Sequence, residues 1–297
     1  AIGTQAMDSG SIGAQTGTIA IGAQALGALT TGAGNLAIGY RAADLLTTGA
    51  RNIVIGQDAF GAAVATLSDN IAIGYGTLAT MNNTASLKNV AIGNYALDDT
   101  GTNDAHKNVC IGYNAGTAVT SGDDNTYVGY AAGAAAESGT KNTCLGSDSN
   151  VGAAGGTNQT VIGYGASGQD DNSVVLGNAD TTAVFMAQDQ GAKVYCQRLE
   201  AKRAGIANVT LSTFSTTASE GGTIYLNRSN HGTIGSYAAV DTNDVLGEIV
   251  FSGSDTDSIE SGGSIKVGAA ETWDADSRGS EMQFQLVPSG VNSTTLT

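Results

Sequence analysis

"NLAIGYRAADLLTTGARNIVIGQDAF", residues 35–60, states one short pattern twice. Asn-Leu-Ala-Ile-Gly at 35–39 returns as Asn-Ile-Val-Ile-Gly at 52–56, 17 residues later. The apolar residues one and three places after each asparagine alternate with period two, as the residues of a β-strand do. Because 17 residues are too few for two helices and a turn, the pattern predicts one β coil for each unit.

The same step recurs along residues 1–180 at intervals of 14 to 19 residues. Its asparagines are Asn35, Asn52, Asn70, Asn89, Asn108, Asn125 and Asn142, and its glycines are Gly22, Gly39, Gly56, Gly74, Gly93, Gly112, Gly129, Gly146, Gly163 and Gly177. Compressed copies precede them, AIGTQA at 1–6 and SIGAQT at 11–16. A period of this length with glycine corners predicts a parallel β-roll or β-solenoid shaft of about 17-residue repeats, in which every coil stacks on the next.

Each position of the unit has an expected place in the coil. We predict that the residue three places after the asparagine forms one interior column, and that the small residue two places after it (Ala37, Ala72 or Ala91) faces a partner chain. Glycine permits the tight corner, and asparagine bonds neighbouring backbone or forms a ladder with the asparagines above and below. The members of the predicted interior column are Ile38, Ile55, Ile73, Ile92, Ile111, Val128, Leu145 and Ile162.

The thinness of such a coil bears on its oligomeric state. Apolar burial stabilises by about 25 cal/mol per Å², whereas ordering each backbone residue costs about 1–2 kcal/mol. With a single isoleucine column and many glycines, an isolated solenoid would be marginally stable. We therefore predict an obligate homo-oligomer, in which several chains pack their Ala and Val faces around a common axis.

Composition excludes several classes of partner. The chain of 297 residues has a formal net charge of −15, which disfavours nucleic acid and anionic membrane surfaces, because both require clustered Lys and Arg. No run of 18 apolar residues is present, so we expect no membrane insertion. The three cysteines, Cys110, Cys144 and Cys196, are too scattered for a disulfide framework or a paired zinc site. The chain begins at Ala1 in mid-pattern, which we interpret as part of a longer protein.

The period stops near residue 180. Residues 181–205 carry four basic residues and are interpreted as a neck, strand-like over 194–196. Residues 206–297 alternate polar and apolar side chains in GTIYLNRS, LGEIVFSGSD, GSIKVGA and EMQFQLVP, which predicts strands of a β-sandwich-like or intertwined distal module. SGSDTDSIESGG, between two of these strands, is predicted to be a loop.

Two family resemblances follow from these motifs. The Asn, small-Ile/Val-Gly unit of residues 1–180 resembles the parallel β-roll heads of trimeric autotransporter adhesins, although the unit here is a few residues longer. TIYLNRSNHGTIGSYAAVDTNDVLGEIVFSGSD, GGSIKV and SEMQFQLVPSG resemble the distal module of tailed-bacteriophage tail fibres. That module is commonly followed by an autoproteolytic chaperone that assembles the trimer, and no chaperone motif is found before Thr297.

The resemblances imply a homotrimeric, all-β, non-enzymatic fibre segment. The expected location is the virion tail fibre. The expected partners are a bacterial surface glycan or outer-membrane protein and the upstream tail or fibre proteins. Two alternatives stay open: a bacterial trimeric surface adhesin, which would need a secretion signal and membrane anchor, and a glycan depolymerase, which would need a carboxylate pair in a cleft.

Motifs for catalysis or cofactor binding are weak. GYGASG at 163–168 fits the dinucleotide pattern G-x-G-x-x-G, but another strand-like segment follows it instead of a helix. His106 and His231 lack a neighbouring Ser or Cys nucleophile. The acid pairs at 98–99, 123–124 and 170–171 are typical turn residues and match no calcium-loop pattern. We expect no catalytic site, no cofactor and no metal.

Aromatic residues are the better candidates for receptor binding. Tyrosines that follow the repeat glycine, at Tyr40, Tyr75, Tyr113, Tyr130 and Tyr164, would form an interrupted ladder able to contact sugar rings, or would only cover a corner of the solenoid. In the distal module the loops at 230–244 and 252–263 are further candidates. Trp273 is a possible binding anchor or part of a trimeric core. The predicted receptor-binding residues are Tyr113, Tyr130, Tyr164, His231, Tyr237 and Trp273.

Overall fold

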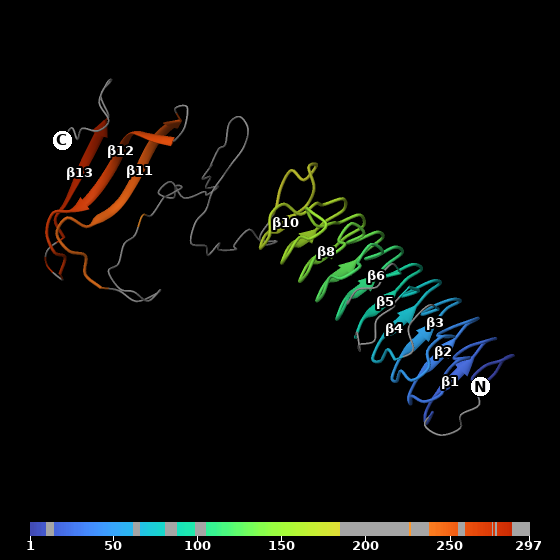
Figure 1. The fold of residues 1–297 in the computed structure, drawn as a ribbon. Helices are drawn as coiled ribbons and strands as arrows, with labels where there is room; N and C mark the ends of the chain where they lie inside the picture. The colour runs from blue at the N-terminus through green and yellow to red at the C-terminus, as the bar shows by residue number, and fades with distance from the viewer. Residues whose placement is uncertain are drawn as a thin grey trace, which may run out of the picture. The chain divides into compact units, whose positions relative to one another are not determined.

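The computed structural model describes residues 1–9, 15–61, 66–80, 88–98, 105–184, 226, 238–254, 259–274, 276 and 278–286. Over these residues the chain is all-β, and it divides into one unit of residues 1–194 and another of residues 195–297 (Figure 1). The division falls inside the segment that was predicted to be a neck, whose strand at 194–196 lies outside the described residues. No helix in the described ranges is long and apolar enough to cross a membrane.

The first unit is the predicted parallel β-solenoid. Ten strands of three residues pair in parallel, each with the next in the chain, so their order in the sheet is their order in the sequence (Figure 1). Ile2 pairs in parallel with Ile21, which places one further coil before the first strand. The strands are β1 (Ile19–Ile21), β2 (Leu36–Ile38), β3 (Ile53–Ile55), β4 (Ile71–Ile73), β5 (Val90–Ile92), β6 (Val109–Ile111), β7 (Thr126–Val128), β8 (Thr143–Leu145), β9 (Thr160–Ile162) and β10 (Val174–Leu176).

The predicted inside and outside of the strands were wrong. The isoleucines do stack in register, for example Ile38 on Ile55, but they lie on the outer face and are partly exposed. The middle residue of each strand, which was predicted to face a partner, instead points into the coil. In nine of the strands this middle residue exposes at most 1% of its own surface; these residues are Ala20, Ala37, Val54, Ala72, Ala91, Cys110, Tyr127, Cys144 and Val161.

The narrow interior explains this reversal. A second buried column, eight places after the asparagine, fills the coil and leaves room only for small residues in most strands. Where the strand contributes Ala91, the second column contributes Leu97, and both are fully buried. Where the strand contributes Tyr127, the second column has Gly133, and a Cβ added there would lie 2.4 Å from the tyrosine ring. Tight packing of this kind tolerates little change in volume.

The repeat glycine is required by both conformation and space. Gly112 has a φ of +141°, in a region that L side chains rarely adopt. A Cβ added to it would lie 2.1 Å from the carbonyl oxygen of Gly129 in the next coil. A Cβ added to the equivalent glycine of most other coils would lie at a similar distance from the corresponding carbonyl oxygen of the next coil. Because successive coils approach so closely, only glycine fits at this position.

The asparagine ladder is confirmed. Asn125 Oδ1 accepts a hydrogen bond from the backbone N–H of Asn142 at 2.9 Å, in the next coil. Asn125 Nδ2 donates to the carbonyl of Gly139 at 2.7 Å, across its own coil, and to Asn108 Oδ1 at 3.0 Å, in the preceding one. Seven successive asparagines and Gln159 are each no more than 2% exposed. The ladder thus satisfies backbone groups that would otherwise be buried without partners.

Replacing Asn125 by alanine removes these bonds from a buried site. It leaves the N–H of Asn142 and the carbonyl of Gly139 unpaired, so we expect the free energy of unfolding to fall by about 2–4 kcal/mol. Urea denaturation followed by circular dichroism measures this change. The matched control is Gln57→Ala, which deletes an exposed amide and should cost less than about 0.5 kcal/mol. Equal losses in the two variants would contradict a structural role of the ladder.

The second unit contains one antiparallel sheet, in the order β11 (Val245–Ser254), β12 (Ile259–Ala269) and β13 (Ser280–Leu286). These confirm three of the predicted strands; the fourth, GTIYLNRS, falls almost wholly outside the described residues. The predicted loop at 252–263 was too long, because residues 252–254 and 259–263 pair in the strands. A second sheet, which a sandwich would require, is not found within the described part of this unit.

Candidate functional site: an exposed row of tyrosines

Four tyrosine rings from four successive coils touch one another on the solenoid surface. The ring centroids of Tyr75 and Tyr95 are 5.2 Å apart at an interplanar angle of 86°. Those of Tyr95 and Tyr113 are 5.9 Å apart at 83°, and those of Tyr113 and Tyr130 are 5.6 Å apart at 6°. These edge-to-face and offset-stacked arrangements are the preferred geometries of aromatic pairs. We call these four residues the tyrosine row.

Tyr95 is the member that the sequence prediction missed. Its coil has Asn94 directly after the repeat glycine, and the tyrosine comes one residue later. Its ring still bridges Tyr75 and Tyr113, because the corresponding residue of the preceding coil is Gly76. A Cβ on Gly76 would lie 3.2 Å from the ring of Tyr95. A search for tyrosine at either of the two positions after the glycine would have found the unbroken row.

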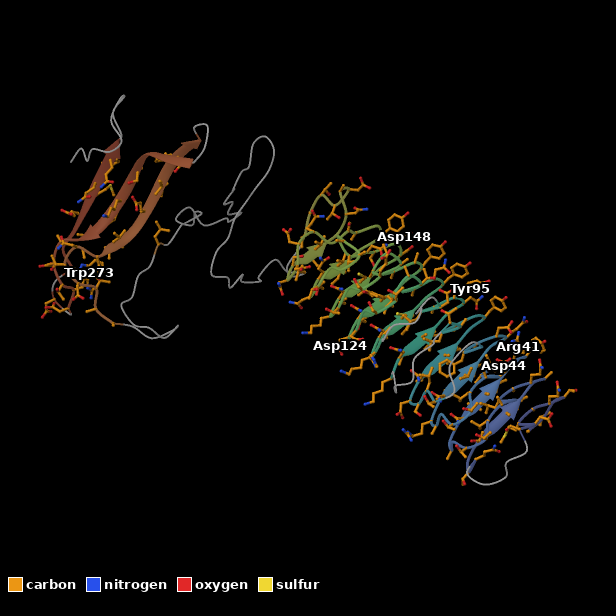
Figure 2. The ribbon with its side chains drawn as sticks, viewed as in Figure 1. Arg41, Asp44, Tyr95, Asp124, Asp148 and Trp273 are labelled. Atoms are coloured by element: carbon orange, nitrogen blue, oxygen red, sulfur yellow. The ribbon has the colours of Figure 1, made fainter. Side chains whose placement is uncertain are left out.

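Charged side chains share the edge of the solenoid that carries the tyrosines. Figure 2 shows Tyr95 on the same edge of the solenoid as Arg41 and Asp148, whereas Asp124 lies on the opposite edge. Arg41 Nε is 2.9 Å from Asp44 Oδ2, and its Nη1 is 3.6 Å from Asp58 Oδ1. The hydrogen bond to Asp44 is the main cause that raises the pKa of Arg41. Arg41, the arginine found on this edge among the described residues, is therefore held by two carboxylates.

The surroundings of Tyr95 favour its protonated hydroxyl. Desolvation, with the closeness of Tyr75 as a further cause, raises the pKa of Tyr95 above its usual value near 10. The Oδ1 of Asn94 accepts a hydrogen bond from the backbone N–H of Tyr75 at 3.0 Å, so this oxygen is already paired within the chain. The site offers ring faces and edges together with hydroxyls that can both donate and accept hydrogen bonds.

The other predicted site residues are not brought together with the row. Tyr40 and Tyr164 occupy the same unit position, but Gln57 and Ser147 separate them from it. Tyr164 is 72% exposed. His231 and Tyr237 lie outside the described residues.

Trp273 belongs to the second unit. Its Nε1 donates to the carbonyl of Gly279 at 3.1 Å, and its ring lines an apolar hollow on one face of the sheet together with Ile249, Ile265 and Met282. It is labelled in Figure 2. Its indole N–H is thus already paired within the chain. Its role as a binding anchor or as part of a trimeric core stays a prediction.

The weak chemical motifs have structural roles. GYGASG follows β9 and leads to strand β10, so no helix N-terminus is present there to bind a pyrophosphate. Asp123 Oδ1 accepts from the backbone N–H of His106 at 2.6 Å, and Asp171 Oδ1 accepts from that of Thr157 at 2.7 Å. Within the described ranges no three His, Cys, Asp or Glu side chains are grouped to hold a metal ion.

The two described cysteines are interior residues. Cys110 and Cys144 flank Tyr127 in the buried strand column and form no disulfide. Burial raises the pKa of Cys144 to about 12, and it raises that of Cys110 as well. Such thiols are protonated at neutral pH and are poor nucleophiles.

Fold and surface together define the class of this protein. It is a parallel β-solenoid repeat protein with an aromatic row along one edge, joined in the chain to a separate antiparallel sheet. A comparison with known protein families finds no family model that matches the chain, and a comparison with curated proteins finds no related sequence.

Proposed function

We propose that this chain is part of a homotrimeric attachment fibre, in which the solenoid is a rigid shaft and the chain binds a bacterial surface without catalysing a reaction. The observation that carries the proposal is a continuous uncharged band on the outer face of the solenoid. The first and third residues of all ten strands form this band, and every one of them is Ile, Val, Leu or Thr. We call it the outer strand band.

The outer strand band is unusual for a solvent-exposed surface. Its members include Ile53, Ile111 and Leu145, which are 36%, 36% and 46% exposed in the single chain. At about 4.8 Å between strands, ten strands make an apolar stripe about 40 Å long. Contiguous exposed apolar surface of this kind marks an interaction site, whereas scattered apolar residues do not.

A second and third copy of the same chain suit this band best. Every coil repeats the band at the same pitch, so parallel copies can match one another coil by coil. With a net charge of −15 per chain, identical chains repel one another, and a contact free of charged side chains minimises that repulsion. The partner face is therefore the Ile and Val face, instead of the Ala face that the sequence suggested.

The resemblance of the distal segment to tail-fibre modules favours a bacteriophage tail fibre as the setting. Strands β11, β12 and β13 carry the LGEIVFSGS, GGSIKV and SEMQFQL segments on which that resemblance rests. Its partners would then be a glycan or protein of the bacterial surface and the upstream fibre proteins. A trimeric bacterial surface adhesin is the second candidate, because the repeat unit resembles adhesin heads.

The combined variant Ile73→Glu/Ile111→Glu tests the assembly. Both residues lie on the third position of their strands, so two charges per chain would enter the apolar contact. We expect at least a hundredfold weaker self-association, measured by sedimentation equilibrium. Labelled variant chains should also bind fewer bacterial cells, because multivalent contact is lost.

The matched control is Leu45→Glu, which places the same charge on a leucine that is 50% exposed outside the strands. It should leave both the association and the cell binding unchanged. Cell binding is measured by flow cytometry on a panel of bacterial strains. If the unmodified chain binds no strain, attachment is excluded for that panel; if the charged variant assembles normally, the outer strand band is not the interface.

A further inference from the structure

We propose that the tyrosine row binds an extended, uncharged glycan that lies along the solenoid axis. This inference rests on the proposed function and names the ligand class of one of its surfaces. Its basis is the unbroken contact of Tyr75, Tyr95, Tyr113 and Tyr130 over four coils, on an edge where polar side chains would suffice for solubility.

The continuity of the row is the first argument. A tyrosine displaced by one residue would normally leave a gap in a column of stacked coils. The gap is closed because Gly76 lets the ring of Tyr95 lie close to the backbone of the neighbouring coil. Two departures from the repeat, at Gly76 and at Asn94–Tyr95, thus compensate each other and keep a continuous aromatic surface.

The exposure of the rings is the second argument. Tyr75, Tyr113 and Tyr130 are 40%, 45% and 55% exposed, although each is large enough to be a major core residue. The mutual contacts stabilise the stack of coils to some extent. Covering a corner, however, does not require aromatic residues, because Ala23, Gln57 and Ser147 serve at the same unit position in other coils.

The geometry of the row favours a polymer of rings. Successive coils are about 4.8 Å apart, which is close to the length of one pyranose unit in an extended chain. Each sugar can then place an apolar face or edge against one tyrosine while its hydroxyls bond to the phenolic oxygens. The regular spacing of the tyrosines along the solenoid therefore suits a polymer whose sugar units also recur at a regular spacing.

Charge selects the class of glycan. In the described part of the solenoid, Arg41 is the arginine on the edge of the row, and it is bound to Asp44 and Asp58. Asp148 adds a further negative charge to this edge. An acidic polysaccharide would face net repulsion from a chain of formal charge −15. Single-stranded nucleic acid also stacks on aromatic rows, but it needs a positively charged groove, and the residues described on this edge form none. A neutral glycan would neither be repelled by the negative charge nor need a positively charged groove.

Affinity electrophoresis and isothermal titration with defined polymers test the proposal. The neutral probes are dextran, mannan, hydroxyethyl cellulose and neutral bacterial O-polysaccharides, and the acidic probe is polygalacturonate. We expect the unmodified chain to bind at least one neutral polymer and not polygalacturonate. The Tyr113→Ala/Tyr130→Ala variant should bind that polymer at least tenfold more weakly, while Tyr113→Phe/Tyr130→Phe, which keeps both rings, should retain most of the affinity.

The control Leu45→Ala removes exposed apolar surface outside the row and should bind normally. Circular dichroism of every variant separates lost binding from lost folding. Binding of none of the neutral polymers, preference for polygalacturonate, or unchanged affinity of the alanine variant would overturn the proposal. Normal cell attachment by the Tyr113→Ala/Tyr130→Ala variant would overturn the glycan proposal and leave the proposed function intact. Binding of a neutral glycan without attachment to any cell would count against the proposed function alone.

Discussion

The Gly112→Ala variant should lose about 3–5 kcal/mol of folding free energy, among the largest effects expected of any single methyl group in this chain. Gly112 has a φ of +141°, and its added Cβ would lie 2.1 Å from the carbonyl oxygen of Gly129. Backbone strain and steric overlap therefore act together, and neither can be relieved without separating two coils. Urea denaturation followed by circular dichroism measures the loss.

Gly155→Ala is the matched control within the same solenoid. Gly155 has no strained φ, and the only near neighbour of its added Cβ is the side-chain oxygen of Ser138 at 3.3 Å. Its substitution should change stability by less than about 0.5 kcal/mol. If Gly112→Ala were equally mild, coils would not be packed as closely as described.

The pair Tyr127 and Gly133 should show strong coupling. Tyr127→Ala alone opens a cavity in a fully buried position, and we expect it to cost about 3–5 kcal/mol. Gly133→Leu alone places a side chain into the space of the tyrosine ring, because even its Cβ would lie 2.4 Å from ring atoms. We expect this second variant to cost at least about 3 kcal/mol.

Combining both substitutions should restore most of the stability. The double variant recreates the pairing of Ala91 with Leu97, two coils earlier. Leucine also tolerates the backbone there, since Leu97 has a φ of 51° at the equivalent position. We expect the double variant to lie within about 1.5 kcal/mol of the unmodified chain, measured by the same denaturation. Additive losses would show that the two columns do not share one space.

The sequence predicts the solenoid well because its period is enforced at every coil. Gly112 lies against a carbonyl oxygen of the next coil, and Asn125 forms hydrogen bonds to backbone groups of its own coil and the next. Each coil repeats these constraints, so both residue types recur visibly in the sequence. The strands of the distal sheet are likewise predicted by alternation, except at their ends beyond Ser252. Period and residue type together therefore give the class of fold and most of its coils.

The sequence misleads about which side of a strand is inside. Hydrophobicity assigns Ile38 to the core, but the inward position of its strand is held by the buried Ala37, and Ile38 lies on the outer face. The second interior column varies among Leu, Phe, Ala and Gly, so it does not stand out as a column in the sequence. The tyrosine row was only partly predicted, because Tyr95 is shifted by one residue from the position of the other tyrosines in the repeat. Its ring nevertheless contacts those of Tyr75 and Tyr113.

The molar mass of the unmodified chain in solution tests the central claim most directly. Sedimentation equilibrium or light scattering, with circular dichroism to verify folding, should give three times the chain mass of 29.5 kDa over a wide range of concentrations. The outer strand band is then covered by identical copies. A stably folded monomer of 29.5 kDa would contradict the proposed fibre shaft.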